Sequence, residues 1–329
     1  MNCLESSPLI FRIFTHSIHF VSLPTYFLAL FSLVSIKSKV FVTYRYFLLW
    51  HVLENLFFEM HSDFLVAPAV HPPFCAIRAT GILSQIGMSS LVQFYWLSLA
   101  IQYTAASVSE MFYFRYKASI LNYKTYRFTY FIKLSVYFIR CISVFDTFLA
   151  ILTSQDAYRF QEEHKATFLK QDPSAHFLTC DNVYLFVPFA DYISTTIIIL
   201  WIVECIVLFL SIPGTAIFIN LSISKSASES TWKIQKNLLK SLVIQASIHS
   251  IMMGVPNGMF NYAFFFGYEN ESLAYGAFVI LTYHGFVSTF ALIIFTKPLR
   301  EYLLIAFKMK KTATQKVSMT SLHKRTSVF

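Results

Sequence analysis

Ionisable side chains stand inside long apolar stretches of this sequence, where they could bind a ligand or exchange a proton. Glu54 lies near the middle of one stretch, and His249 and His284 lie at similar depth in two others. A carboxylate beside an imidazole can form a pair whose proton moves when the surroundings change. We therefore expect Glu54 to meet one of these histidines, and Ser288 to share the face of His284 one helical turn away. The alternative is that each histidine is a hydrogen-bonded structural residue.

Polar residues also recur at helical spacing in the stretch 79–106. The four that a single helix would present on one face are Gln85, Ser89, Gln93 and Trp96. Polar groups inside a membrane-spanning helix are costly, so they are functional candidates. We expect Gln85 and Ser89 to line a ligand pocket in the outer half of this helix. Gln93 and Trp96 would lie deeper in the same pocket. Hydrogen bonding that only packs helices together is the alternative.

No catalytic or metal-binding motif accompanies these residues. The sequence lacks GxSxG, HExxH and a Gly-rich phosphate loop. His16 and His19 form an isolated pair near the outer end of the first apolar stretch, where we expect them to serve packing. The net charge of +9 comes from short basic clusters without zinc spacing or a DNA-binding motif. We therefore expect no enzyme activity, no cofactor, no metal site and no nucleic-acid partner.

Long segments without charge must position the polar candidates. The 31 residues between Arg78 and Glu110 contain no Asp, Glu, Lys or Arg, and about 20 apolar helical residues cross a bilayer. Charged residues make up 13% of the chain, against about 25% in soluble domains. We predict an all-α membrane protein, a bundle of seven transmembrane helices, with six or eight left open. The expected spans are about 14–36, 46–69, 79–106, 130–154, 187–212, 241–266 and 273–296.

The distribution of basic residues predicts the orientation of this bundle. With the N-terminus outside, 19 of the 26 Lys and Arg residues fall in inner loops and the tail, and 5 fall in outer loops. The positive-inside rule then places the N-terminus outside and the C-terminus in the cytoplasm. The basic inner segments also suit contact with anionic membrane lipid. Leu303, Leu304 and Phe307 fall on one side of the segment after the last span, which predicts a short amphipathic helix.

Two cysteines lie where the outer face is expected. Cys75 precedes the third span, and Cys180 ends the longest outer loop, just before the fifth span. Disulfides persist in the oxidising exterior, so we expect a Cys75–Cys180 bridge that holds this loop over the bundle. The alternative is two free thiols. Cys141 and Cys205 are expected to be embedded and inert.

Two C-terminal segments carry a family resemblance. The stretch KIQKNLLKSLVIQASIHSIMMGVP at 233–256, followed by YHGFVSTFALIIFTKPLR at 283–300, resembles the nematode serpentine chemoreceptors of class H in the Str superfamily. The runs GILSQIGMSSLVQFY at 81–95 and SEMFYFRY at 109–116 are similar to that family's third span and the segment after it. Class I is a close alternative. Leu299 stands where the family usually has Tyr.

The resemblance implies a G-protein-coupled receptor with its N-terminus outside. Its ligand would be an external small molecule, odorant-like or pheromone-like, and its partner a heterotrimeric G protein. The expected location is the plasma membrane, in the sensory cilium of a chemosensory neuron. Pro256 should kink the sixth span, whose inner end moves in such receptors, although a static kink is the alternative. The inner-face residues expected to meet the G protein are Arg115, Lys117, Lys236 and Lys240.

The domain organisation follows from these expectations. Residues 1–311 would form the receptor domain, including the short amphipathic helix, and residues 312–329 a disordered basic tail rich in Ser and Thr. A multi-span transporter is the main rival, but transporters usually carry internal repeats and helices interrupted by Gly or Pro, and this chain has eight Gly. A ligand-gated channel subunit is the third possibility. The sequence does not predict an oligomeric state.

Overall fold

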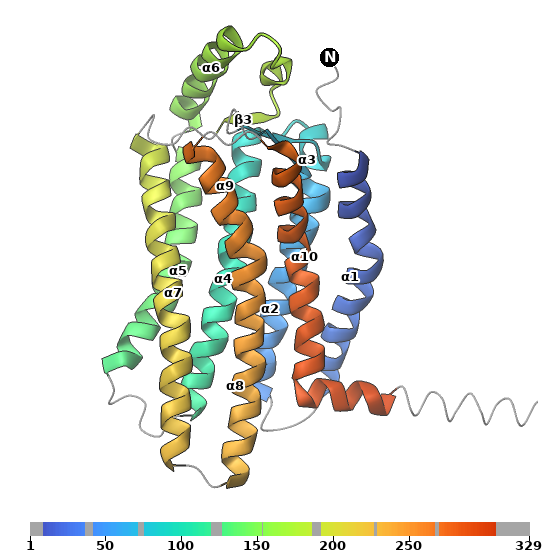
Figure 1. Ribbon diagram of the computed structural model, residues 1–329, viewed down its shortest axis with the longest axis vertical. Coiled ribbons are helices and arrows are strands. Elements are labelled where there is room, and N and C mark those ends of the chain that lie inside the picture. Colours follow the sequence, from blue (N-terminus) through green and yellow to red (C-terminus); the bar gives the residue numbers. More distant parts are fainter. Residues whose placement is uncertain are drawn as a thin grey trace, which may run out of the picture.

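Apolar segments of this chain fold as helices, because backbone groups away from water must bond within their own segment. The computed structural model describes residues 9–36, 42–71, 76–119, 127–152, 154–185, 192–226, 229–266 and 270–306. Within these ranges seven long helical segments run side by side as a bundle (Figure 1). They are α1 (Leu9–Ser35), α2 (Val42–Met60) with η1 (His61–Val66), α4 (Ser90–Ser119), α5 (Arg127–Leu152), α7 (Tyr192–Ser226), α8 (Glu229–His249) with η5 (Ser250–Gly254) and α9 (Val255–Phe266), and α10 (Glu271–Phe295).

Four of the helices in the described ranges are long and apolar enough to cross a membrane on their own. These segments are Ile13–Ser35, Arg127–Leu149, Ile202–Asn220 and Ser272–Phe295. Three spans expected as single helices are interrupted instead. The stretch 46–69 passes from α2 into the π-helical η1 and ends in a short strand over residues 68–71. The stretch 79–106 begins in a strand, passes through the short helix α3 (Ile82–Gln85) and turns at Gly87, whose φ of 81° suits glycine. The stretch 241–266 contains the π-helical turn η5 just before Pro256.

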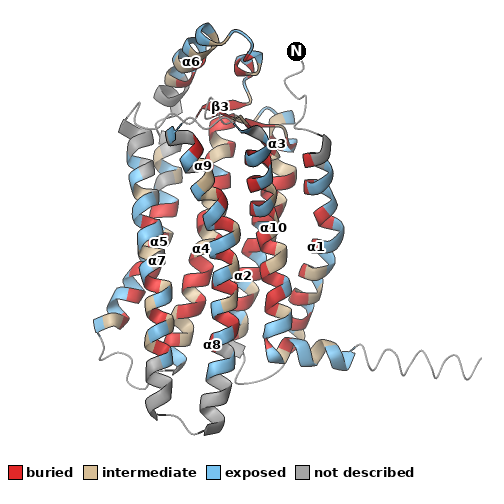
Figure 2. Ribbon diagram, in the orientation of Figure 1, coloured by how far each residue is buried: buried red, intermediate tan, exposed pale blue. Residues whose placement is uncertain are grey.

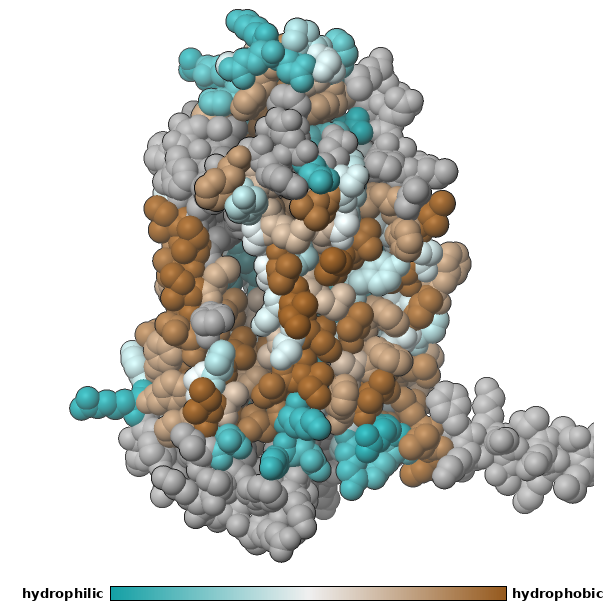
Figure 3. Space-filling model, in the orientation of Figure 1, coloured by the Kyte–Doolittle hydropathy of each residue, from teal (hydrophilic) through white to brown (hydrophobic). Residues whose placement is uncertain are grey.

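The outward faces of the bundle are apolar. On α1 the exposed side chains include Phe20, Phe27 and Val34, and on α7 they include Ile206 and Leu210. Figure 2 shows buried residues on the inward faces of the helices and exposed residues outside. Figure 3 shows the hydrophobic side chains as a belt around the middle, with hydrophilic residues at both ends. A surface of this extent suits lipid rather than water.

A small sheet and a helix cover one end of the bundle, which we call the sheet end. The strands β1 (Pro68–His71), β2 (Ala76–Ala79) and β3 (Val183–Leu185) pair antiparallel in the order β1-β2-β3. The helix α6 (Ser154–Gln171) stands above them (Figure 1). The Gln161 amide donates to the Leu185 carbonyl and accepts from the Leu185 N–H, both at 2.6 Å. These bonds tie α6 to the sheet.

The opposite end of the bundle, which we call the tail end, is where α10 leads into a helix over residues 297–306 that turns away from the bundle (Figure 1). Leu303 is half-buried and Leu304 is exposed along this helix, while Phe307 lies outside the described residues. Leu299, at its start, is fully buried in a core cluster with Leu33 and Leu292. A smaller side chain than Tyr at this position therefore packs inside the bundle.

Candidate ligand-binding site

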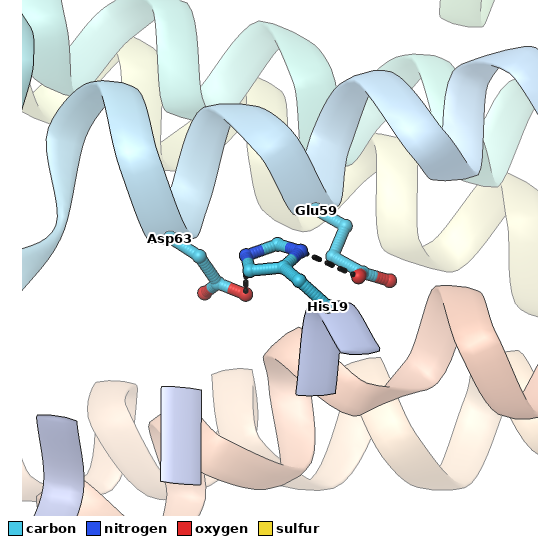
Figure 4. A group of neighbouring side chains, drawn as sticks. All are labelled: His19, Glu59 and Asp63. Carbon is cyan, nitrogen blue, oxygen red and sulfur yellow. Dashed lines mark ion pairs between the residues drawn. The ribbon is translucent and has the colours of Figure 1, made fainter. Parts of the chain in front are cut away.

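A histidine lies between two carboxylates in the half of the bundle nearest the sheet end. Nδ1 of His19 is 3.2 Å from Oε1 of Glu59, and Nε2 of His19 is 3.4 Å from Oδ2 of Asp63 (Figure 4). All three residues are buried, with exposed fractions of 5%, 0% and 2%. We call these three residues the His19 cluster. His19 was expected only to pack, so the sequence reading missed its contact with the carboxylates.

Three helical segments bring the His19 cluster together. His19 comes from α1, Glu59 from the last turn of α2, and Asp63 from the π-helical turn η1 that continues it. A spacing of four residues keeps Glu59 and Asp63 on one face. Glu59 also accepts a hydrogen bond from the Ser22 hydroxyl and one from the Tyr26 hydroxyl at 2.9 Å. Glu59 is therefore held by two hydroxyl donors besides the imidazole.

Asp63 is less completely satisfied than Glu59. The Ser62 hydroxyl donates to Oδ1 of Asp63 at 3.3 Å, and within the described part of the chain no hydrogen-bond donor reaches Oδ2 of Asp63. The 3.4 Å separation from His19 is an ion-pair distance without hydrogen-bond alignment. A buried carboxylate oxygen without a donor is costly, so Asp63 is the member of the His19 cluster that can gain most from a new partner.

A cavity of about 280 Å³ borders the His19 cluster at Asp63. This volume lies near the lower end of the range for small-molecule pockets. The walls combine aromatic and aliphatic side chains with hydroxyl and amide groups. The lining residues are Phe11, Thr15, His16, Ser62, Asp63, Phe64, Ala67, Pro68, Thr80, Gly81, Ile82, Gln85 and Phe278. Donors and acceptors in an apolar setting can orient a small ligand.

Gly81 shapes the wall of this cavity. A Cβ at this position would lie 2.4 Å from the Leu65 carbonyl oxygen, closer than real side chains approach backbone. The Gly81 N–H donates to the Val66 carbonyl at 2.8 Å. The backbone of the segment before α3 therefore packs directly against η1, which keeps Gln85 at the cavity.

Of the residues predicted to line a pocket, Gln85 is at the cavity wall. Ser89 lies between α3 and α4, where its hydroxyl accepts from the Val92 N–H at 3.4 Å. Gln93 is fully buried and donates to the Met88 carbonyl at 2.7 Å and to the Ser84 hydroxyl at 3.1 Å. Trp96 is 41% exposed, with its ring 6.0 Å from that of His61. The prediction that these four residues share one helical face is wrong, because the turn at Gly87 lies between Gln85 and the other three.

The predicted histidines His249 and His284 lie side by side deeper in the bundle, and a third histidine that the sequence reading missed, His51, lies beside His249. The His51 ring centroid lies 5.1 Å from that of His249, which in turn lies 5.1 Å from that of His284. Nε2 of His51 is 3.1 Å from the Ser288 hydroxyl, and its Nδ1 is 2.7 Å from that of Ser107. Three helices, α2, α8 and α10, contribute the rings. Among them His249 and His284 are near each other, as their similar depth suggested.

The expected pair between Glu54 and a histidine is wrong, because Glu54 meets an arginine. Nη1 of Arg140 donates to Glu54 at 2.9 Å, while its Nε and Nη2 donate to the two oxygens of Glu110 at 3.0 and 3.1 Å. We call these three residues the Arg140 cluster; it joins α2, α4 and α5. The guanidinium also lies 4.3 Å from the centroid of the Tyr103 ring. No role was assigned to Arg140 from the sequence.

The remaining candidates lie at the two ends. Pro256 is buried and is the second residue of α9, which follows η5. Toward the tail end, Arg115 stacks on Tyr44 at 3.6 Å, Lys117 lies 5.3 Å from the Tyr113 ring, and Lys236 and Lys240 are exposed. At the sheet end Cys180 is disulfide-bonded. Its predicted partner Cys75 lies outside the described residues, so that pairing stays a prediction.

The described part of the chain offers one group of side chains with metal-binding chemistry. One donor atom from each member of the His19 cluster lies within 4.8 Å of the others. Both oxygens of Glu59 already accept hydroxyl hydrogen bonds, and each nitrogen of His19 faces a carboxylate. A metal ion would have to displace these contacts to be coordinated.

Comparison with known proteins assigns the bundle to a family. The sequence model of a family described as "Serpentine type 7TM GPCR chemoreceptor Srh" matches residues 6–309. No curated protein matches the chain. The matched region includes every described helix of the bundle and the sheet that covers its end.

Proposed function

The chain belongs to the Srh family of serpentine seven-transmembrane GPCR chemoreceptors, and from this premise we propose that it binds an external small molecule and activates a heterotrimeric G protein. As a member of this family it is a membrane receptor, and enzymes are not expected in such a family. The sequence resemblance to class H agrees with the family assignment.

The cavity at Asp63 is the observation that carries the proposal. It lies at the sheet end between α1, η1, α3 and α10, where the family topology would face the exterior. A ligand there would touch α1, the α2–η1 segment and α10 together. A receptor responds when a ligand binds one arrangement of its helices better than another, so a site between helices has the required geometry.

The middle of the bundle offers a route for the response. The rings of His51, His249 and His284 connect α2, α8 and α10. Immediately beyond His249, the η5 turn and Pro256 interrupt the sixth long segment, and such interruptions let a helix bend. A ligand that shifts α10 or η1 could thus change the angle of α8, whose exposed Lys236 and Lys240 lie toward the tail end.

We propose the plasma membrane as the location, in the sensory cilium of a chemosensory neuron, with the sheet end outside and the tail end in the cytoplasm. The excess of basic residues in the tail-end segments supports this orientation. In this orientation Arg115, Lys117, Lys236 and Lys240 would face the G protein. Anionic lipid would share the same surface.

The test is a signalling assay on the full-length chain. Cultured cells would carry sensors of G-protein dissociation and receive a panel of volatile and water-soluble small molecules. The cavity-filling variant Ile82→Trp is compared with Ile86→Trp, which enlarges a neighbouring exposed residue of the α3 turn that does not line the cavity. We expect a response that Ile82→Trp abolishes and Ile86→Trp retains at equal surface level. Ligand-driven uptake or current without any sensor response would favour a transporter or a channel and contradict the proposal.

A further inference from the structure

The His19 cluster and the cavity beside it indicate the charge of the ligand. We propose that the cavity binds a small organic ammonium ion, whose cationic nitrogen pairs with Asp63. This inference rests on the proposed role of the cavity as the ligand site. It adds a chemical class, a monovalent organic cation, to that role.

The first argument is the number of acidic and basic side chains in the His19 cluster. Each ring nitrogen of His19 faces a carboxyl oxygen, at 3.2 and 3.4 Å, and neither contact has hydrogen-bond alignment. Two acidic side chains therefore share one basic side chain. Within the described part of the chain, His19 is the one basic residue within ion-pair distance of either carboxylate.

The second argument is which of the two carboxyl groups is left with an unpartnered oxygen. Glu59 receives the Ser22 and Tyr26 hydroxyls and lies beside His19, so both of its oxygens have partners. Asp63 receives one long hydrogen bond from Ser62, and among the described residues no donor reaches its Oδ2, although the residue is 2% exposed. A buried carboxyl oxygen without a hydrogen-bond donor is costly. A cation arriving from the cavity would meet Asp63, because Asp63 alone of the two carboxylates lines it.

The third argument is the chemistry of the cavity walls. Phe64 lies 4.3 Å from His19 between ring centroids, and the rings of Phe11 and Phe278 meet at 6.0 Å. Aromatic walls favour an organic cation through their negative ring faces and exclude water from the ion pair. Ser62 and Gln85 add polar groups near the same wall. The cavity of about 280 Å³ admits an ammonium with an attached carbon skeleton.

A divalent metal ion fits the same residues less well. A tetrahedral site would need His19, Glu59 and Asp63 to turn lone pairs toward one point. The Glu59 oxygens are already occupied by hydroxyl donors, and the two nitrogens of His19 point to different carboxylates. Asp63 Oδ2 is the acceptor left over, and a single oxygen suits one ammonium better than a coordinated metal ion.

The experiment measures binding directly, without signalling. The purified full-length protein in lipid nanodiscs is heated with methylamine, butylamine or phenethylamine, and separately with methanol, butanol or 2-phenylethanol as uncharged counterparts. A ligand that binds the folded state and not the unfolded state raises Tm, by an amount that grows with the logarithm of its concentration above Kd. We expect at least one amine to raise Tm by several degrees at a concentration where its alcohol has a smaller effect.

Variants assign the effect to the proposed residue. Asp63→Asn keeps the shape of the side chain and should weaken amine binding on the order of 10- to 100-fold. Glu54→Gln, in the Arg140 cluster, removes a carboxylate elsewhere and should leave amine binding unchanged. If Asp63→Asn does not fold, Ile82→Trp provides a second variant that closes the cavity from its rim and should abolish the amine effect.

Each result has a defined meaning. Equal stabilisation by amines and alcohols, or unchanged amine binding in Asp63→Asn, would overturn the inference. So would the absence of any amine effect. Stabilisation by Zn²⁺ that is lost in His19→Ala would overturn it in favour of a metal site. Amine binding without G-protein activation would leave the inference standing and contradict the proposed function. Activation only by uncharged compounds would support the proposed function and overturn the inference.

Discussion

The bundle contains two clusters that share one arrangement of acidic and basic side chains but differ in their surroundings. In each, one basic side chain lies between two carboxylates: His19 between Glu59 and Asp63, and Arg140 between Glu54 and Glu110. Arg140 donates three hydrogen bonds at 2.9 to 3.1 Å. His19 approaches its carboxylates at 3.2 and 3.4 Å without hydrogen-bond alignment.

The difference follows from the chemistry of the two cations. A guanidinium carries five donors in a rigid fork, so Arg140 can meet three carboxylate oxygens at once. An imidazole has two nitrogens on opposite sides of its ring, so His19 can only bridge two carboxyl groups. The Arg140 cluster is therefore suited to hold α2, α4 and α5 in one arrangement. The His19 cluster is suited to receive another cation, because a cavity borders the carboxylate that His19 satisfies least.

Breaking the Arg140 cluster should lower the stability of the folded protein more than any other change considered. Arg140→Met leaves Glu54 and Glu110 facing each other without a cation, and breaking a buried ion pair costs about 3–5 kcal/mol. We expect low surface expression and a much lower Tm, measured by surface labelling and thermal unfolding. The matched control is the double variant Arg140→Met with Glu54→Gln, which removes a carboxylate together with the cation. If the single variant were as stable as the original chain, Arg140 would not hold the helices together.

Removing the basic side chain of the His19 cluster should lower the stability by a smaller amount. His19→Ala leaves Glu59 with two hydroxyl donors and Asp63 beside the cavity, so we expect a loss of about 1–3 kcal/mol. Tm in nanodiscs is the measurement, and Glu59→Gln in the same background should restore part of the loss. A destabilisation equal to that of Arg140→Met would erase the distinction between the two clusters.

The interrupted third segment offers a third contrast, between a structural glutamine and a glutamine at the cavity. Gln93→Leu removes the bonds to the Met88 carbonyl and the Ser84 hydroxyl and should cost about 1–2 kcal/mol, whereas Gln85→Ala at the cavity rim should change stability by less than about 0.5 kcal/mol. Thermal unfolding of both variants separates the roles. A larger stability loss for Gln85→Ala would contradict them.

The exposed lysines of α8 should show the smallest effect on stability. Lys236→Ala and Lys240→Ala change exposed side chains, so we expect Tm to stay within a degree or two of the original chain. G-protein activation should fall severalfold, since a basic surface near the tail end would be weakened. Unchanged signalling at equal surface level would remove these residues from the proposed partner surface.

The sequence predicted the number and general course of the long helices, because length without charge is a local property. It could not predict the interruption at Gly87, since an isolated glycine in an apolar stretch fits a helix as well as a turn. The spacing of four residues is enough to place Glu59 and Asp63 on one helical face, as they are in the structure. The sequence could not predict that His19 faces them, since periodicity tells which residues share a face and not which helix lies opposite.

The same limit explains the errors about Glu54 and His51. Depth along the helices suggested a histidine for Glu54, and the structure provides Arg140, from a helix whose neighbours were unknown. His51 lies one turn before Glu54 and was overlooked, yet it contacts Ser107 and Ser288 and lies beside His249. A search for every ionisable residue on one face of α2 would have found His51. Its partners depend on how three helices meet, which local patterns do not determine.

Cysteine labelling tests the central claim most directly, namely that the cavity beside Asp63 opens to the outside of the cell. Gln85→Cys and Lys240→Cys would each be made in a background where Cys3, Cys141 and Cys205 are serine, and treated with a membrane-impermeant cationic methanethiosulfonate reagent. We predict that Gln85→Cys is labelled in intact cells, and that an amine which raises Tm slows this labelling. Lys240→Cys should be labelled only after permeabilisation. Labelling of Lys240→Cys but not Gln85→Cys in intact cells would contradict the receptor topology and the proposed site together.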